Sequence, residues 1–285
     1  MSTSPDIKTA LSYGMEILVD SPSSRLDCEV LLAYVFQKNR SHLRAWPDKS
    51  LSADQYGAYK KLLGLRQQGR PVAYLTGERE FWSRSFLVSD DVLIPRPETE
   101  LLIEIIQQKF DSDDVFTALD LGTGSGAIAV TLACEFKNSN VVATDISSNA
   151  LPIAQKNAER LSINKIQFIR SDWFQQLPET QFDLIVSNPP YICDSDPHLQ
   201  EGDLRFEPSS ALVAKQQGMQ DFKRIIAAAD EFLKPGGFLL FEHGYQQGNH
   251  LQNLLDLAGF KLTEQFKDLQ GHPRATIGQK LQTLR

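Results

Sequence analysis

The chain has 285 residues, of which 41% are hydrophobic and 23% charged, and its formal net charge is −7 at pH 7. These fractions are ordinary for a soluble globular protein, and the length allows a domain of about 200 residues beside a smaller one. The acidic balance argues against a protein that binds long nucleic acid through its backbone, and no apolar run approaches the ~18 residues of a membrane helix.

The three cysteines, Cys28, Cys134 and Cys193, are widely scattered and form no CxxC pair, so the sequence indicates neither a disulfide framework nor a metal site. The first six residues lack the basic and apolar regions of a secretory signal peptide. A reducing cytoplasm is therefore the expected location. The protein is expected to act as a monomer, with no membrane partner and no sequence-specific nucleic-acid partner.

Apolar residues recur at helical spacing through the first 70 residues. One such run covers Ile7–Val19 and a second covers Leu26–Val35. Ser52 is suited to cap a third helix that runs toward Gly69. These runs predict a small helical bundle at residues 1–72.

The next segment, residues 73–95, is expected to be a connector. Its aromatic residues and the alternation from Glu80 to Val92 predict a β-hairpin. From about Val115 onward, short apolar runs alternate with helical segments. Such alternation is typical of a parallel sheet that is covered by helices on both faces.

Seven strands are expected in this second domain, which is taken as residues 96–285. They lie near 115–121, 140–145, 166–170, 182–187, 237–242, 260–266 and 274–279. Helices are expected near 126–136, 149–161 and 219–233. The last two strands are suited to pair antiparallel at one edge. The fold class is therefore α/β, with a Rossmann-like, mostly parallel sheet of seven strands.

A glycine-rich loop joins the first strand of this sheet to the first helix. Glycines there let backbone N–H groups turn toward a ligand at the helix N-terminus. The pattern alone is weak, because a tight turn without a ligand would use the same residues, but its place between strand and helix favours a cofactor site. The predicted cofactor-binding residues of the loop are Gly122, Thr123, Gly124, Ser125 and Gly126.

Acidic residues follow the next two strands. Asp145 comes about twenty residues after the loop, where a carboxylate is suited to accept from both hydroxyls of a ribose. A helix cap is the alternative for this residue. Asp172 and Trp173 end the third strand, where the acid is suited to an exocyclic amine and the indole to a purine face. A surface turn with a buried tryptophan explains that pair nearly as well.

The stretch Asn188-Pro189-Pro190-Tyr191 follows an apolar run that predicts a buried parallel strand. The asparagine carries an acceptor oxygen, and the two prolines add backbone carbonyls without competing N–H groups. A strand that ends in carbonyl acceptors is suited to hold an –NH2 group. Tyr191 is expected to wall this slot, although a core aromatic after a turn would also fit.

These loops all follow the carboxyl ends of strands, where open α/β sheets bind their ligands. A ribose-bearing cofactor is therefore expected beside a cradle for an amine or amide. NAD would need a hydride-accepting site, and the chain indicates none. S-adenosylmethionine fits better, since its activated methyl group would face a nitrogen and S-adenosylhomocysteine would be the product.

Longer stretches of the chain resemble a known family. Arg70–Gly77, Asp91–Glu100, Arg205–Pro208, Glu242–Gly244 and the tail from Asp268 onward look like those of the peptide chain release factor glutamine N5-methyltransferases. The Asn-Pro-Pro-Tyr motif alone is shared with DNA adenine and ribosomal RNA methyltransferases. The resemblance covers nearly the whole chain.

The resemblance implies methylation of the glutamine side-chain amide in the Gly-Gly-Gln motif of class-one release factors, which would be the protein partners. Asn188 would contact both cofactor and substrate, and the following residues through Tyr191 would hold the glutamine. The helical bundle is expected to recognise the substrate. Arg96 has no obvious helical role and is expected to line the site, whereas His243 is not assigned to it.

The expected mechanism needs no dedicated base. The Asn188 side-chain oxygen and the Pro189 carbonyl would accept from both N–H groups of the amide and aim its nitrogen at the methyl group. Methylation of adenine N6 in DNA, or of a base amine in RNA, is the alternative, because the same cradle accepts an aromatic –NH2. A non-catalytic adaptor that binds cofactor and docks through residues 1–75 is a third possibility.

Overall fold

The computed structural model describes residues 5–281, so most of the stretch tested above for a signal peptide lies outside the described residues. The chain divides into two compact units. The helical unit comprises the residues up to Glu78 together with Gln200–Phe206, which we call the inserted segment. The sheet unit comprises Arg79–Leu199 and the residues from Glu207 onward.

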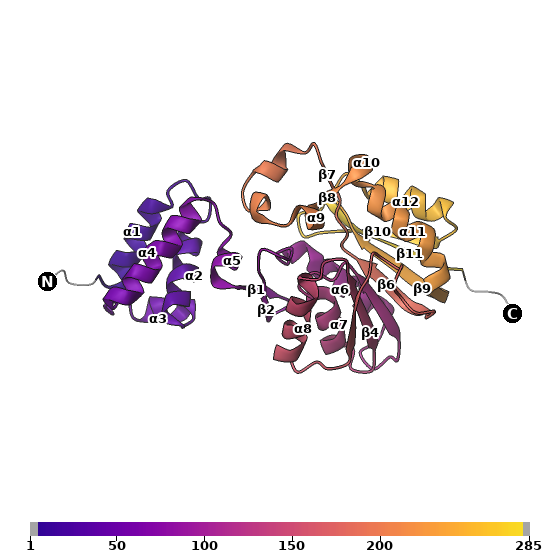
Figure 1. The fold of residues 1–285 in the computed structure, drawn as a ribbon, viewed down its shortest axis with the longest axis horizontal. Helices are drawn as coiled ribbons and strands as arrows, with labels where there is room; N and C mark the ends of the chain where they lie inside the picture. The colour runs from indigo at the N-terminus through magenta and orange to yellow at the C-terminus, as the bar shows by residue number, and fades with distance from the viewer. Residues whose placement is uncertain (1–4, 282–285) are drawn as a thin grey trace. The chain divides into compact units, whose positions relative to one another are not determined.

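The helical unit contains the three predicted helices and two additional short ones (Figure 1). Its helices are α1 (Ile7–Ile17), α2 (Ser24–Phe36), α3 (Arg40–Ala45), α4 (Ala53–Gln67) and α5 (Val72–Thr76). Ser52 caps α4 as predicted, because its hydroxyl accepts from the Gln55 N–H at 3.1 Å while the Gln55 side chain accepts from the Ser52 N–H at 2.9 Å. Helices α3 and α5 are too short to show a helical repeat in the sequence.

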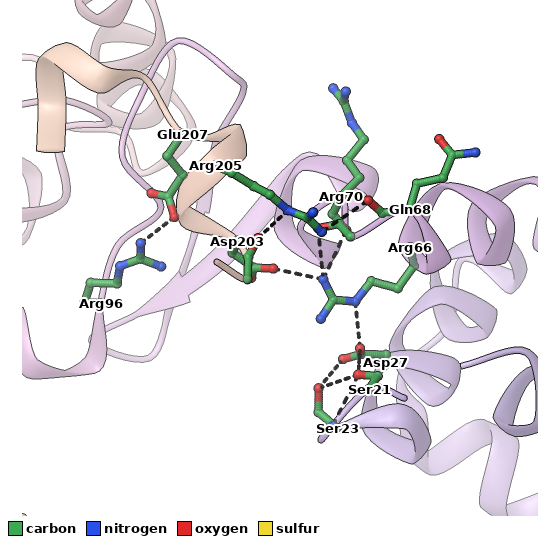
Figure 2. Close-up of polar contacts among 12 residues, drawn as sticks. Ser21, Ser23, Asp27, Arg66, Gln68, Arg70, Arg96, Asp203, Arg205 and Glu207 are labelled. Carbon is green, nitrogen blue, oxygen red and sulfur yellow. Dashed lines mark hydrogen bonds and ion pairs between the residues drawn. The ribbon is translucent and has the colours of Figure 1, made fainter. Parts of the chain in front are cut away.

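A half-buried arginine connects the inserted segment to the helices. Arg66 on α4 donates from Nε to Asp27 Oδ2 at 2.8 Å and from Nη1 to Asp203 Oδ1 at 2.9 Å (Figure 2). The hydroxyls of Ser21 and Ser23 also donate to Asp27, at 3.0 and 2.9 Å. The buried Asp27 charge is therefore paired and hydrogen-bonded, as burial of a carboxylate requires.

We expect the substitution Asp203→Ala to loosen the inserted segment without unfolding the helical unit. The Asp203 side chain is 40% exposed, so its ion pair adds only ~0–1 kcal/mol, and Arg66 keeps its bond to Asp27. Tryptic cleavage after Arg205 should become several-fold faster while the Tm changes little. The exposed-site variant Asp48→Ala serves as the control, and equal cleavage of the two variants would contradict the role of Asp203.

The sheet unit contains the seven predicted strands. They are β3 (Thr117–Leu121), β4 (Asn140–Asp145), β5 (Ile166–Arg170), β6 (Phe182–Ser187), β9 (Leu233–Glu242), β10 (Lys261–Lys267) and β11 (Pro273–Gln279). Their order is β10-β11-β9-β6-β3-β4-β5. From β9 to β5 neighbouring strands are parallel, whereas β11 pairs antiparallel with both β9 and β10. The predicted α/β class and the antiparallel pairing at one edge are confirmed.

Helices cover both faces of this sheet (Figure 1). They are α6 (Glu100–Lys109), α7 (Ala127–Glu135) and α8 (Ala150–Arg160) on one face and α11 (Gln220–Phe232) and α12 (Gly248–Leu257) on the other. Successive strand residues point to opposite faces, so Ala118 and Leu240 pack with the first group and Leu119 and Leu239 with the second. Helix α12 was not predicted, because its polar, glycine-containing start hides the helical repeat.

The remaining elements are short. They are the hairpin strands β1 (Glu78–Phe81) and β2 (Arg84–Leu87), the 3₁₀ turns η1 (Pro97–Thr99), η2 (Pro197–Gln200) and η3 (Leu204–Phe206), and β7 (Ile192–Cys193), α9 (Ser209–Leu212), β8 (Val213–Ala214) and α10 (Lys215–Gly218). The predicted hairpin is confirmed, but it ends at Leu87. Among residues 5–281, none of the helices combines the length and the apolar content that crossing a membrane requires.

Candidate functional site

A cavity of about 260 Å³ lies at the carboxyl ends of β3, β4, β5 and β6. Its volume is just below the ~300–1,000 Å³ that is typical of small-ligand sites. The predicted site residues that line it are Gly122, Gly124, Asp145, Asp172, Trp173, Asn188 and Pro190. The topology therefore brings together the ends of four strands that are far apart in the sequence.

Two glycines form the loop side of the cavity. Gly122 and Gly124 have φ values of +75° and +55°, which side chains with a Cβ rarely adopt. A Cβ added at Gly122 would lie 3.6 Å from the Trp173 ring, whereas one added at Gly124 would meet no protein atom within 4 Å. The backbone at Gly124 is therefore open to close approach by a ligand.

The other three loop residues predicted to bind cofactor do not line the cavity. The Thr123 hydroxyl donates to Asp120 Oδ2 at 2.7 Å, and the Ser125 carbonyl accepts from a side-chain amide on α8 at 2.8 Å. A Cβ added at Gly126 would lie only 3.0 Å from Ala154 Cβ. These residues shape the loop and let α8 pack close to it.

Asp120 is a fully buried acid beneath this loop. Its Oδ2 also accepts from the Ala129 N–H at 3.2 Å, and its Oδ1 has no hydrogen-bond partner among the described residues. Burial raises the pKa of Asp120 to about 7, against the hydrogen bonds from Thr123 and Ala129, which lower it. The sequence reasoning did not use this residue, although an acid inside an apolar strand is a recognisable signal.

Asp145 lies on the cavity wall at the end of β4 and accepts from two backbone N–H groups. Its Oδ2 accepts from the Gly124 N–H at 2.9 Å and its Oδ1 accepts from the Ser147 N–H at 2.8 Å. Burial raises the pKa of Asp145, and these two backbone hydrogen bonds oppose that rise. Each carboxylate oxygen has two lone pairs, so the group retains acceptor capacity on the cavity wall.

Two charged residues of α11 complete the rim beside Trp173. Arg224 donates from Nη2 to Asp172 Oδ2 at 2.8 Å, so the predicted acceptor is already engaged. Burial raises the pKa of Asp221, while Arg224 and a hydrogen bond from the Trp173 side chain lower it. Asp221 and Arg224 both line the cavity, and the helical pattern of α11 gave no sign of this role.

The Asn188–Tyr191 motif contributes unequally to the cavity. Asn188 lies on its wall and donates from Nδ2 to Thr99 Oγ1 at 3.3 Å. Pro189 and Tyr191 are not among the lining residues. The Tyr191 hydroxyl instead donates to Glu242 Oε1 at 3.3 Å, and burial raises the pKa of Tyr191. Thr99 and Glu242 are partners that the sequence reasoning did not identify.

Arg96, which was expected to line the site, is not among the residues that line this cavity. It forms an ion pair with Glu207, whose side chain is completely buried (Figure 2). The other oxygen of Glu207 accepts from the Ile94 N–H at 3.2 Å. A buried carboxylate needs such a partner, which explains why the guanidinium is held there.

His243 is a hydrogen-bonded residue at the end of β9. Its Nδ1 donates to the Gly244 carbonyl at 2.9 Å, and its Nε2 lies 2.8 Å from Thr276 Oγ1. Burial lowers the pKa of His243, which favours the neutral ring. It is not among the residues that line the cavity.

Comparison with known proteins identifies the family. The Methyltransferase small domain matches residues 96–202, and the PrmC N-terminal domain matches residues 9–77. The chain is 47% identical to the release factor glutamine methyltransferase of Salmonella typhimurium over 96% of this chain and 98% of that protein. The chain belongs to the release factor glutamine methyltransferase family. The Escherichia coli relative of the same name is 44% identical over 95% of this chain and 98% of its own length.

The fold of this family member is also seen in more distant methyltransferases. A methyltransferase from Pyrococcus furiosus matches with a TM-score of 0.54 at 19% identity, covering 70% of this chain and 91% of that one. A Thermus thermophilus 16S rRNA methyltransferase, solved with AdoMet and guanosine, matches with a TM-score of 0.52 at 21% identity over 71% of this chain and 49% of that one. At such identities the likeness concerns the fold alone.

Proposed function

We propose that this protein transfers a methyl group from S-adenosylmethionine to the side-chain amide nitrogen of the glutamine in the Gly-Gly-Gln motif of class-one release factors. The main support is the position of Asn188, which lines the same cavity as Gly122 and Gly124 of the glycine-rich loop. The family relatives, which match nearly the whole chain, are named for glutamine methylation. Base-amine methylation has no comparable support.

The cavity residues fit the proposed cofactor. Gly124 offers an open backbone, Asp145 retains acceptor capacity for ribose hydroxyls, and the Trp173 ring is available to a purine face. When bound, S-adenosylmethionine supplies a methyl group that its sulfonium activates. Thr123, Ser125 and Gly126 would act only through the shape of the loop.

Asn188 and Pro189 offer two acceptors that are suited to an amide nitrogen. Such a nitrogen is a poor nucleophile, because its lone pair is delocalised into the carbonyl. The Asn188 Oδ1 and the Pro189 carbonyl would accept from its two N–H groups, orient it and stabilise the positive charge that develops during attack. The nitrogen gains the methyl group and gives up one proton to water.

The helical unit is proposed to recognise the release factor, and the protein is proposed to work as a monomer. The support for a recognition role is that residues 9–77 match a domain model named for this family rather than for methyltransferases in general. Because release factors act in translation, the proposed place of action is the cytoplasm.

Mass spectrometry of a release factor treated with this protein and S-adenosylmethionine tests the proposal. A single methyl group on the glutamine of Gly-Gly-Gln is the expected result. Duplex DNA and ribosomal RNA, offered in parallel with tritiated cofactor, serve as the comparison substrates. Label in nucleic acid but not in the release factor would overturn the proposal, and so would a methyl group on another residue.

A further inference from the structure

A buried acid behind the Asn188–Tyr191 motif has no part in the mechanism described so far. Glu242 ends β9 and is 1% exposed. Its Oε1 accepts from the Tyr191 hydroxyl at 3.3 Å, but its Oε2 has no hydrogen-bond partner among the described residues. A buried oxygen without a hydrogen-bond partner destabilises the folded state, so such oxygens are rare in native proteins.

Thr99 is a buried hydroxyl that contacts the asparagine of the same motif. It is 5% exposed, and its Oγ1 accepts from Asn188 Nδ2 at 3.3 Å. A hydroxyl that accepts through its oxygen still has one proton to donate. The unpartnered Oε2 of Glu242 would be satisfied by that proton, and Thr99 lies near enough to lower the pKa of Glu242.

We propose that Thr99 and Glu242 are positioning residues that fix which end of the Asn188 side-chain amide faces the substrate. The inference rests on the proposed function, because it concerns the same amide cradle. An ionised carboxylate can only accept, so Thr99 must donate to Glu242 and accept from Asn188. Asn188 then presents its NH2 to Thr99 and keeps its oxygen for the N–H groups of the substrate.

Hydrogen bonds that run in the reverse direction would prevent Asn188 from holding the substrate amide. A protonated Glu242 can donate to Thr99, which frees the Thr99 proton to turn toward Asn188. The Asn188 amide could then rotate and present its NH2 group to the substrate NH2, where two sets of donors repel each other. The ionisation of Glu242 therefore selects the productive orientation of Asn188.

Burial and the groups around Glu242 set the pH at which its carboxyl ionises. Burial raises its pKa to about 7, whereas Thr99, Arg274 and Tyr191 lower it and Glu98 raises it. Both nitrogens of the neighbouring His243 ring already form hydrogen bonds, with the Gly244 carbonyl and the Thr276 hydroxyl, and burial lowers the pKa of His243 and so favours the neutral ring. The carboxylate is thus ionised above about pH 7 and protonated below it.

The first test compares Thr99→Val with Thr99→Ser. With release factor and saturating S-adenosylmethionine, the valine variant should lose roughly tenfold or more in kcat, a part of the ~10²–10³-fold that one such contact contributes. The serine variant keeps the hydroxyl and should stay within about twofold of the wild type. The matched control is Thr131→Val, which removes a buried α7 hydroxyl that has no partner among the described residues.

The pH dependence of kcat distinguishes a positioning role of Glu242 from a purely structural one. The wild-type kcat should fall as the pH drops below about 7, because Glu242 becomes protonated there. Glu242→Gln should be slower at neutral pH and should lack this acidic limb. If kcat of Glu242→Gln falls at acidic pH as it does in the wild type, the proposal is contradicted.

A spectroscopic readout distinguishes failure of this inference from failure of the proposed function. In ¹H–¹⁵N spectra of the cofactor-free protein, the Asn188 side-chain amide, assigned by its loss in Asn188→Asp, should shift with an apparent pKa near that of Glu242. Thr99→Val and Glu242→Gln should each abolish that titration, and Thr131→Val should preserve it. If the Asn188 signals behave alike in all three variants, Thr99 and Glu242 do not orient the amide, whatever the enzyme methylates.

Discussion

Replacing Asn188 by alanine should lower the methylation rate of the release factor by about 100- to 1,000-fold. The substitution removes one of two acceptors that orient the amide and stabilise charge on its nitrogen, a loss of about 2–4 kcal/mol of transition-state stabilisation. The affinity for S-adenosylmethionine should fall only modestly, because Gly124 and Asp145 remain on the cavity wall. Single-turnover rates together with calorimetric titration of S-adenosylhomocysteine would measure both quantities.

The appropriate control is Asn253→Ala, which removes an asparagine side chain from an exposed position of α12. This variant should turn over at the wild-type rate. Near-normal turnover of Asn188→Ala would remove Asn188 from the mechanism. A loss of cofactor affinity as large as the loss of rate would assign Asn188 to binding instead of catalysis.

The strands were predictable because buried parallel strands are short apolar runs between turn residues. The bounds of β4, β5 and β6 agree with the predicted ranges, since each of these strands pairs on both sides or ends at an abrupt change of composition. Between β6 and α11 the structure forms only brief elements. Elements of two to four residues contain too few positions for any repeat to show, so the sequence could not predict them.

The candidate site was predictable only in part, for a physical reason. Parallel topology brings the carboxyl ends of strands together, so Gly122, Asp145 and Asn188 could be placed at one edge from local patterns alone. The contact between Asn188 and Thr99 joins residues 89 apart in the chain, and that between Tyr191 and Glu242 joins residues 51 apart. Such pairs depend on how helix, loop and strand pack, which one sequence does not reveal.

Arg96 illustrates the same limit. Its charge and its place in the Pro-Arg-Pro turn made it a reasonable candidate for the site. A guanidinium, however, pairs with a buried carboxylate as readily as it binds a substrate. Glu207 lies 111 residues further along the chain and is buried beside it. The ion pair is therefore explained by the burial of Glu207, and no local pattern around Arg96 could have indicated it.

We further expect Asp145→Ala to weaken the binding of S-adenosylhomocysteine by roughly 30- to 1,000-fold, or about 2–4 kcal/mol. The substitution removes the acceptor proposed for two ribose hydroxyls, and hydrogen bonds to a charged group are the stronger kind. It also removes the carboxylate that accepts from the Gly124 N–H at 2.9 Å, so the loop loses a stabilising hydrogen bond. Calorimetric titration at neutral pH would give the dissociation constants.

Two further variants separate the contributions of Asp145. Asp145→Asn keeps a side-chain oxygen that can accept from the Gly124 N–H but lacks the negative charge, so it should bind more tightly than Asp145→Ala and more weakly than the wild type. Asp48→Ala, at an exposed position of the helical unit, should bind like the wild type. If Asp145→Ala also binds like the wild type, the carboxylate serves only to hold the Gly124 and Ser147 N–H groups. The ribose must then be held by another group on the cavity wall.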